Sequence, residues 1–280
     1  MRWPALSVTK KEALAALAAL AGVAATGEAG AARLFWRRRR RRLAAAALLS
    51  GGLADGFLLY SFLVPNFPLG GRVFYRGSHS GNLIALTFDD GPRPPFTDQI
   101  LNVLKHEGVR ATFFVLGENA LRYPEAVRRM EAEGHRVASH GMDHDILMWA
   151  RPWQVRLQLA LTSQAIEAAG VKDPARLFRA PHGWLGPAAH RAATGAGYQV
   201  AGWTKGVWDT AAPGVDKIIS RTVELLGPGS VLLLHDGWRG LQEEDRSQTV
   251  AALPEIISLA RSRGLAFATV EEMMNEAGLR

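Results

Sequence analysis

The sequence predicts an α/β domain with a parallel sheet, preceded by a transmembrane helix. Two observations favour the sheet. Short apolar, β-rich runs alternate with helical patterns, and a glycine follows each helical pattern, where a helix is expected to stop. A third observation, six consecutive arginines followed by 22 mostly apolar residues, predicts the membrane helix. The strand–helix alternation fits either a barrel or an open sheet, and periodicity does not choose between them.

Seven strands and six helices are expected after residue 72. The strands are predicted at 83–88, 111–116, 136–139, 177–180, 199–203, 231–234 and 266–270. The helices are predicted near 97–107, 123–133, 152–169, 187–196, 215–226 and 246–262. The glycines that follow these helices are Gly108, Gly134, Gly170, Gly197, Gly227 and Gly264.

The N-terminal region divides at the arginine run. The stretch 43–64 carries one charge, Asp55, and as a helix it spans about 33 Å, enough for a bilayer core of about 30 Å. Asp55 costs roughly 2.5–3.5 kcal/mol at mid-span, which the large apolar side chains of the stretch offset. The arginines place 1–42 in the cytoplasm. We therefore expect a basic cytoplasmic segment at 1–42, an anchor at 43–64, a linker at 65–79 and an extracytoplasmic domain at 80–280.

Two alternatives apply to this region. The stretch 43–64 also fits a buried Ala/Leu-rich helix with a basic cap. A cleaved signal peptide fits less well, since no small-x-small site closes the apolar stretch. The earlier apolar run 13–26 is too short to span a bilayer, so whether it contacts the membrane is left open.

Charge and cysteine content exclude several functional classes. The net charge of +7 lies wholly in residues 1–70, and residues 71–280 hold 23 basic and 23 acidic side chains. A basic face for nucleic acid is therefore not expected on the globular part. The chain has no cysteine, which excludes disulfides, iron–sulfur clusters and thiolate zinc sites.

Chemically active side chains cluster at the ends of the predicted strands. They are Asp89, Asp90, His140, His144, Arg179, Asp209 and His235. Taken singly, each motif fits a turn, a cap or a surface histidine. The carboxyl ends of parallel barrel strands meet on one face, so together they predict a site. Two imidazoles and one carboxylate form an open site for a divalent metal, beside which a second carboxylate suits a general base and a third histidine a general acid.

Four motifs carry a family resemblance: TFDDGP at 87–92, HGMDH at 140–144, RAPHG at 179–183 and LLLHD at 232–236. In this order they resemble the polysaccharide deacetylase family, the NodB-type domain of carbohydrate esterase family four. The resemblance covers residues 80–270. It implies a distorted (β/α)7 barrel and metal-dependent hydrolysis of N-acetyl groups on an extracellular carbohydrate polymer, with release of acetate.

The resemblance also implies roles for individual residues. Asp89 would be the general base, held by Arg179, and His235 the acid that protonates the leaving amine, oriented by Asp209. The metal ligands would be Asp90, His140 and His144. The oxyanion and acetyl group would contact the backbone N–H of His182, the side chain of Leu233, and Trp184 or Trp208. Zinc suits this ligand set, with cobalt, nickel and manganese as alternatives.

Two positions depart from the family pattern. Gly141 stands where the family has a serine or threonine that steadies the metal loop, which predicts weaker metal binding. Asp209 is followed by Thr210 rather than tryptophan, so the aromatic wall of the pocket is expected from Trp208 or Trp184, or is absent.

Alternatives remain open for the substrate and for catalysis. Peptidoglycan is the natural substrate for a tethered extracytoplasmic domain, but chitin-like and exopolysaccharide chains fit equally. A deacylase of a lipid-linked or small glycan is one alternative function. A non-catalytic glycan-binding module is another, although it would need neither Asp89 nor His235. The choice between N- and O-deacetylation and the oligomeric state are also left open.

Overall fold

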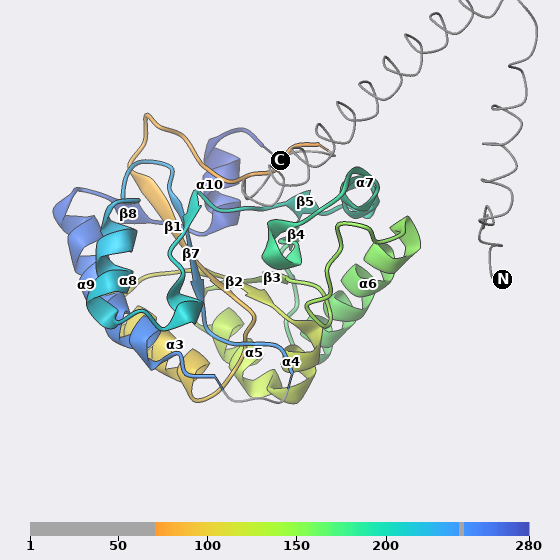
Figure 1. The fold of residues 1–280 in the computed structure, drawn as a ribbon, viewed down its shortest axis with the longest axis horizontal. Coiled ribbons are helices and arrows are strands. Elements are labelled where there is room, and N and C mark those ends of the chain that lie inside the picture. The colour runs from red at the N-terminus through yellow and green to blue at the C-terminus, as the bar shows by residue number, and fades with distance from the viewer. Residues whose placement is uncertain (1–70, 241–243, 280) are drawn as a thin grey trace, which may run out of the picture. The chain divides into compact units, whose positions relative to one another are not determined.

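A computed structural model describes residues 71–240 and 244–279. These residues form a curled parallel sheet with helices packed around it (Figure 1). The predicted anchor at 43–64, the basic segment before it and the first part of the linker lie outside the described residues. Within the described ranges, no helix is both long and apolar enough to cross a membrane.

The sheet has eight strands in the described part of the chain, and every pair of strands is parallel. The central strand β1 (Leu83–Asp89) lies between β2 (Thr112–Val115) and β7 (Val231–His235), and it also pairs with β8 (Ala266–Phe267). The sheet continues from β2 through β3 (Arg136–Ser139) and β4 (Leu177–Phe178) to β5 (Gln199–Val200). On the other side, β7 pairs with β6 (Lys205–Gly206).

Helices connect the strands and cover the outside of the sheet (Figure 1). They are α3 (Phe96–Glu107), α4 (Gly117–Arg122), α5 (Pro124–Ala132), α6 (Pro152–Ala168), α7 (Pro187–Gly195), α8 (Val215–Val223), α9 (Ser247–Ser262) and α10 (Val270–Glu276). The largest apolar cluster joins β1, β2 and β7 to the inner faces of all these helices except α7 and α10, for example through Phe88, Phe113 and Ile256. This packing fixes the carboxyl ends of the central strands on a rigid frame.

All seven predicted strands are present, but four are shorter than expected. The strands predicted at 111–116 and 177–180 are observed as Thr112–Val115 and Leu177–Phe178. The predicted strand 199–203 ends at Val200, because the Gly202 carbonyl turns to accept a hydrogen bond from the buried Arg179 side chain (2.7 Å). The predicted strand 266–270 ends at Phe267, because Thr269 caps α10 in a reciprocal pair with Glu272. The eighth strand β6 and the helices α4 and α10 were not predicted. Each is at most seven residues long, too short for a clear periodicity.

Residues assigned to the end of the linker are hydrogen-bonded to the domain. The Phe74 amide donates to the Val200 carbonyl and its carbonyl accepts from Gly202, both at 2.8 Å. The Gly77 amide donates to the Gly229 carbonyl at 2.8 Å. In the described residues β5 and β6 do not pair with each other. The segment 73–77 therefore bonds to the chain next to β5 and to the turn before β7, at the open side of the sheet.

Close backbone packing behind the site predicts a large effect of a small substitution. A Cβ on Gly237 would lie 2.4 Å from the Asp90 carbonyl oxygen and 2.7 Å from the Gly91 Cα. Backbone atoms cannot yield as a flexible side chain can, so Gly237→Ala is expected to lower the free energy of unfolding by about 1–3 kcal/mol. Urea denaturation measures this. Gly195→Ala is the matched control, since its Cβ would meet nothing within 4 Å. Equal unfolding midpoints for the two variants would contradict the prediction.

Candidate active site

Asp90, His140 and His144 form a compact group of possible metal ligands. The Asp90 Oδ1 lies 3.3 Å from the Nε2 of His140 and 3.2 Å from the Nε2 of His144. One ligand atom from each residue lies within 4.8 Å of the others, and all three side chains are largely buried. It is the one such group of three or more ligands in the described part of the chain. The strands β1 and β3 bring these residues together from positions 50 apart in sequence.

Backbone conformation and further hydrogen bonds orient the three possible ligands. Asp90 adopts φ 72°, and its carbonyl accepts a hydrogen bond from Asn119 Nδ2 at 2.8 Å. The Nδ1 of His140 contacts the Arg179 carbonyl oxygen at 2.8 Å, which leaves Nε2 facing Asp90. Such an outer contact fixes the ring orientation and the tautomer of a metal-binding histidine. His144 also adopts a left-handed conformation, φ 63°.

The loop between the two histidines is held by α6. Gln158 accepts a hydrogen bond from the Met142 amide (2.5 Å) and donates to Asp143 Oδ1 (2.8 Å). Gly141 has φ 85° and its amide donates to Ser139 Oγ at 3.2 Å. The loop therefore has side-chain support at the position where the family hydroxyl is missing. Whether the metal binds more weakly stays a prediction.

The charges at this cluster suit a bound cation. Burial acts to raise the pKa of Asp90, but the adjacent imidazole of His140 and the further histidines outweigh it, so the pKa falls well below its ordinary value. Burial lowers the pKa of His144 to about 3, which leaves this ring neutral near pH 7. The buried Asp90 Oδ1 and His144 Nδ1 have no hydrogen-bond partner. A buried, ionised carboxylate oxygen that lies 3.2–3.3 Å from two imidazole nitrogens fits a divalent metal.

Asp89 lies beside this cluster and is tied to a buried arginine. Its Oδ1 accepts a hydrogen bond from Arg179 Nη1 at 2.6 Å, and its Oδ2 lies 3.8 Å from the Nε2 of His140. Arg179 is fully buried, and it also donates to Thr87 Oγ1 (2.8 Å) and to the Gly202 carbonyl (2.7 Å). These bonds fix the guanidinium, so one carboxylate oxygen of Asp89 is held and the other faces the possible metal ligands.

His235 and Asp209 form a hydrogen-bonded pair on the same face. The Nδ1 of His235 contacts Asp209 Oδ1 at 2.8 Å, and the His235 amide donates to Oδ2 at 2.9 Å. Thr249 Oγ1 of α9 donates to the same Oδ2 at 2.9 Å. Burial acts to lower the pKa of His235, but the charge and hydrogen bond of Asp209 raise it to about 9. The imidazolium form is therefore favoured at neutral pH.

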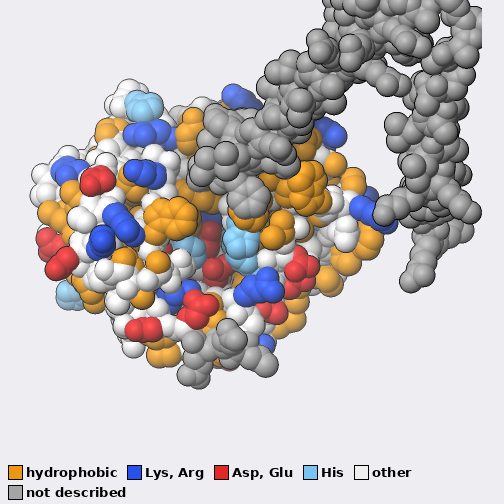
Figure 2. Space-filling view, in the orientation of Figure 1, with side chains coloured by type: hydrophobic (Ala, Val, Ile, Leu, Met, Phe, Trp, Pro, Cys, Tyr) orange, Lys and Arg blue, Asp and Glu red, His pale blue; other side chains and the backbone are white. Residues whose placement is uncertain are grey.

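The remaining predicted residues lie around this cluster with unequal exposure. The His182 ring contacts the rings of His144 and Trp184, with centroids 4.6 and 4.9 Å apart. Leu233 is buried in β7, two residues before His235. Trp208 directly precedes Asp209 and is 68% exposed. Figure 2 shows histidine and acidic side chains gathered in a hollow with hydrophobic side chains beside it. Trp184 is thus in ring contact with His182, whereas Trp208 is largely open to solvent.

Three positioning residues were missed by sequence reasoning: Thr249, Gln158 and Asn119. Each makes a hydrogen bond to a site residue or its loop from a helix distant in sequence. A single polar residue in a helix carries no signal of such a contact, so none was available in the sequence.

Comparison with known proteins decides the family. The polysaccharide deacetylase family model matches residues 76–201. A chitooligosaccharide deacetylase from Bradyrhizobium sp. (strain ANU 289) is 39% identical over 187 residues, 65% of this chain and 85% of the relative. The chain belongs to the polysaccharide deacetylase family. A peptidoglycan-N-acetylglucosamine deacetylase from Bacillus cereus is 35% identical over 206 residues, 73% of this deacetylase and 93% of the relative.

Solved structures agree with the fold and with the enzyme class. The Bc1960 peptidoglycan N-acetylglucosamine deacetylase aligns with a TM-score of 0.67 and 30% identity, covering 71% of this chain and 91% of that one. The curled parallel sheet with its helices matches the distorted barrel of this family. A mutant of BA3943, a family-four pseudoenzyme with restored activity, aligns with a TM-score of 0.66 and 26% identity, covering 72% of this chain and 71% of that one. The protein is a deacetylase-type hydrolase.

Proposed function

We propose that this deacetylase is a metal-dependent enzyme that hydrolyses N-acetyl groups on an extracytoplasmic glycan and releases acetate. One observation carries the proposal. Three groups lie together at the carboxyl ends of the strands: the possible metal site, the fixed carboxylate of Asp89 and the His235–Asp209 pair. Hydrogen bonds hold each of them in place. With a cation bound by the possible metal ligands, this combination would supply the Lewis acid, the base and the acid that amide hydrolysis uses.

Asp90, His140 and His144 would hold the metal. A divalent ion there would make water more acidic and polarise the amide carbonyl. Asp89 and Asp90 raise the pKa of His140 above its ordinary value against the effect of burial, which favours the protonated ring when no cation is bound. Metal binding requires the neutral ring and would release that proton. Zinc suits the ligand set, with cobalt, nickel and manganese as alternatives.

Asp89 and His235 would exchange the protons of the reaction. Asp89 accepts a proton from the attacking water through Oδ2, the oxygen that Arg179 does not bind. His235 has its Nδ1 bound to Asp209, so its Nε2 donates a proton to the leaving nitrogen. The C–N bond breaks as the amine is protonated, and the water oxygen becomes part of acetate. The His182 amide would donate to the oxyanion, and Leu233 and Trp184 would line the acetyl pocket.

Peptidoglycan and chitin-like chains are the two substrate classes proposed. The relatives include a chitooligosaccharide deacetylase and a peptidoglycan-N-acetylglucosamine deacetylase, so both N-acetylated classes are supported by similarity. The arginine run and the apolar stretch 43–64 favour a single-pass anchor with the domain outside the cytoplasm. A cell-wall glycan is the polymer that such a tether would meet.

Acetate release by the full-length protein in mild detergent tests the proposal. We expect release from chitooligosaccharides or from peptidoglycan that stops with a chelator and returns with added zinc. The preferred substrate then identifies the glycan class. Metal that binds without any acetate release from either glycan would count against both substrate classes and favour a lipid-linked glycan or a different small glycan. Release that persists after verified metal removal would refute metal dependence.

A further inference from the structure

The outward face of α6 is apolar. Trp153, Leu157 and Leu161 follow one another at intervals of four residues, so they lie along one side of the helix. Their exposed fractions run from 39% to 54%. In the loop before α6, Ile146 is 51% exposed and Trp149 is 77% exposed. We call these five residues the α6 face. Figure 2 shows hydrophobic side chains over the flank where Figure 1 places α6.

The α6 face lies outside the apolar core of the domain. The opposite side of α6 already packs into the core through Val155 and Leu159. A helix that is apolar on both sides normally has a partner on each. Large exposed apolar patches mark protein or membrane interaction sites. The described residues provide no cover for the α6 face.

The charges of the segment fit a lipid surface. Arg151 and Arg156 are exposed beside the two tryptophans. The preceding loop has two acidic residues: Asp145 is exposed, and Asp143 is half-buried and hydrogen-bonded to Gln158. Glu167 lies at the far end of α6. Tryptophan is enriched where membrane meets water, and exposed arginines attract anionic headgroups. The combination of aromatic, aliphatic and basic side chains is typical of interfacial helices.

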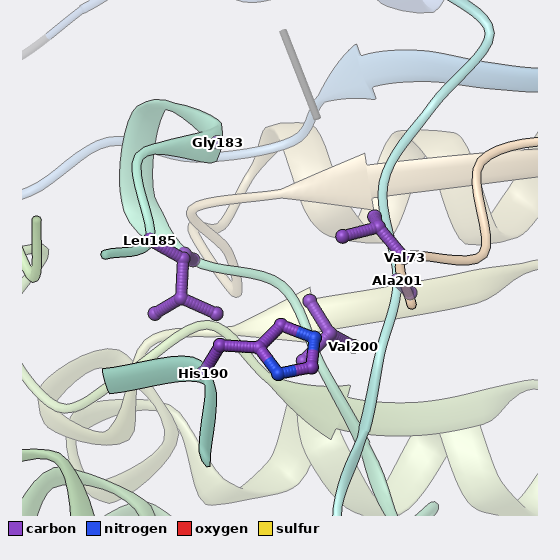
Figure 3. Close-up of a pocket in the computed structure, with 7 residues that line it drawn as sticks. Val73, Gly183, Leu185, His190, Val200 and Ala201 are labelled. Carbon is purple, nitrogen blue, oxygen red and sulfur yellow. The ribbon is translucent and has the colours of Figure 1, made fainter. Parts of the chain in front are cut away.

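The chain enters the domain on the side of α6. The Arg72 carbonyl contacts Nε2 of His190 in α7 at 2.9 Å, and Figure 3 shows His190 beside Val73 and Val200. The helix α7 packs against α6 through Ala189 and Ala192 in the same apolar cluster. The cavity at this contact, about 10 Å³, has room for about one water, so it is no ligand site. The first described residues are thus attached to the helix next to α6.

We propose that the α6 face lies on the surface of the lipid bilayer in which the chain is anchored. The inference rests on the proposed anchor and is independent of the proposed hydrolysis. Six residues, 65–70, separate the predicted span from Gly71. Their greatest reach is about 20 Å, so the domain stays next to the bilayer. Gln158 of α6 also holds the loop between the metal-ligand histidines. Docking of α6 would therefore fix the orientation of the site relative to the membrane, so that the site faces glycan close to the bilayer.

The absence of cysteine makes the test direct. Leu157→Cys in the full-length protein gives a single thiol for an environment-sensitive fluorophore. Ser220→Cys is the matched control, on the exposed side of α8, which Figure 1 shows across the sheet from α6. Each protein is placed in lipid nanodiscs at one chain per disc, with phosphatidylglycerol and spin-labelled lipid. We expect lipid quenching at least about twofold stronger at position 157 than at position 220.

The outcomes separate the anchor from the docking face. A full-length chain that does not float with vesicles overturns the anchor and, with it, the docking proposal. A chain that floats but shows equal quenching at the two positions overturns docking alone. Shielding at position 157 that persists in detergent and grows with protein concentration would assign the face to a second copy instead. Acetate release is a separate measurement, so a failed hydrolysis assay changes none of these readings.

Discussion

Replacing Asp89 with asparagine is expected to lower acetate release by about two to four orders of magnitude, the usual effect of removing a general base. Asparagine keeps the shape and can still accept the hydrogen bond from Arg179 that now measures 2.6 Å, but it cannot take a proton from water. Asp89 is outside the Asp90–His140–His144 group. Metal content should therefore stay unchanged while kcat falls. Single-turnover acetate release and metal analysis of the same preparation measure both quantities.

A second variant separates chemistry from folding. Asp89→Asn leaves the buried Arg179 without its carboxylate, which lowers stability as well as activity. Thr87→Val removes another Arg179 contact, of 2.8 Å, with little change of volume and keeps Asp89. If disturbance of Arg179 caused the lost activity, Thr87→Val would lose activity to a similar degree. We expect Thr87→Val to lose stability but to keep most of its kcat.

The parts of the site that sequence could predict are those at strand ends. Asp89 and Asp90 directly follow an apolar run, and His235 ends another, so the parallel sheet alone brings them to one face. Their register confirms this, since Asp89 is the partner of His235 in the pairing of β1 with β7. The family motifs then indicated the role of each of these residues, which the periodicity of the sequence does not reveal. The sequence also predicted the seven main strands, because each is a distinct apolar run.

Contacts between distant segments could not be predicted. Thr249 reaches Asp209 from 40 positions away, and the partner of Arg179 in the turn after β5 is a carbonyl, which no side-chain pattern marks. The interpretation of Gly141 shows the same limit. The sequence revealed a missing hydroxyl but not that Gln158 of α6 holds the loop from outside. Tertiary hydrogen bonds depend on the assembled fold, and a local pattern carries no record of them.

Replacing Asp209 with asparagine should shift the pH dependence of the enzyme. Asp209 raises the pKa of His235 from 6.5 to about 9 against the effect of burial. Without that charge, only the smaller effects of Asp90 and Asp89 oppose burial, so the pKa of His235 falls. A general acid works only while it holds its proton. We therefore expect kcat/KM of the natural enzyme to decline on the alkaline side near pH 9, and that of Asp209→Asn to decline at a lower pH, which a pH–rate profile of acetate release measures.

Thr249→Val provides the comparison that identifies the cause. It removes the 2.9 Å hydrogen bond to Asp209 Oδ2 but leaves the carboxylate charge, so the pH at which its kcat/KM declines on the alkaline side should change little.

The free energy of unfolding should also decrease as the pH rises. Because the folded pKa of His235 is raised, its stabilising contribution is complete below pH 6.5 and is lost as the pH rises through about 9. Asp209→Asn should reduce this pH dependence of unfolding, since Asp90 and Asp89 remain. If instead Asp209→Asn kept the alkaline limb near pH 9, His235 would not be the acid that limits the reaction, and its bond to Asp209 would serve only to position the loop.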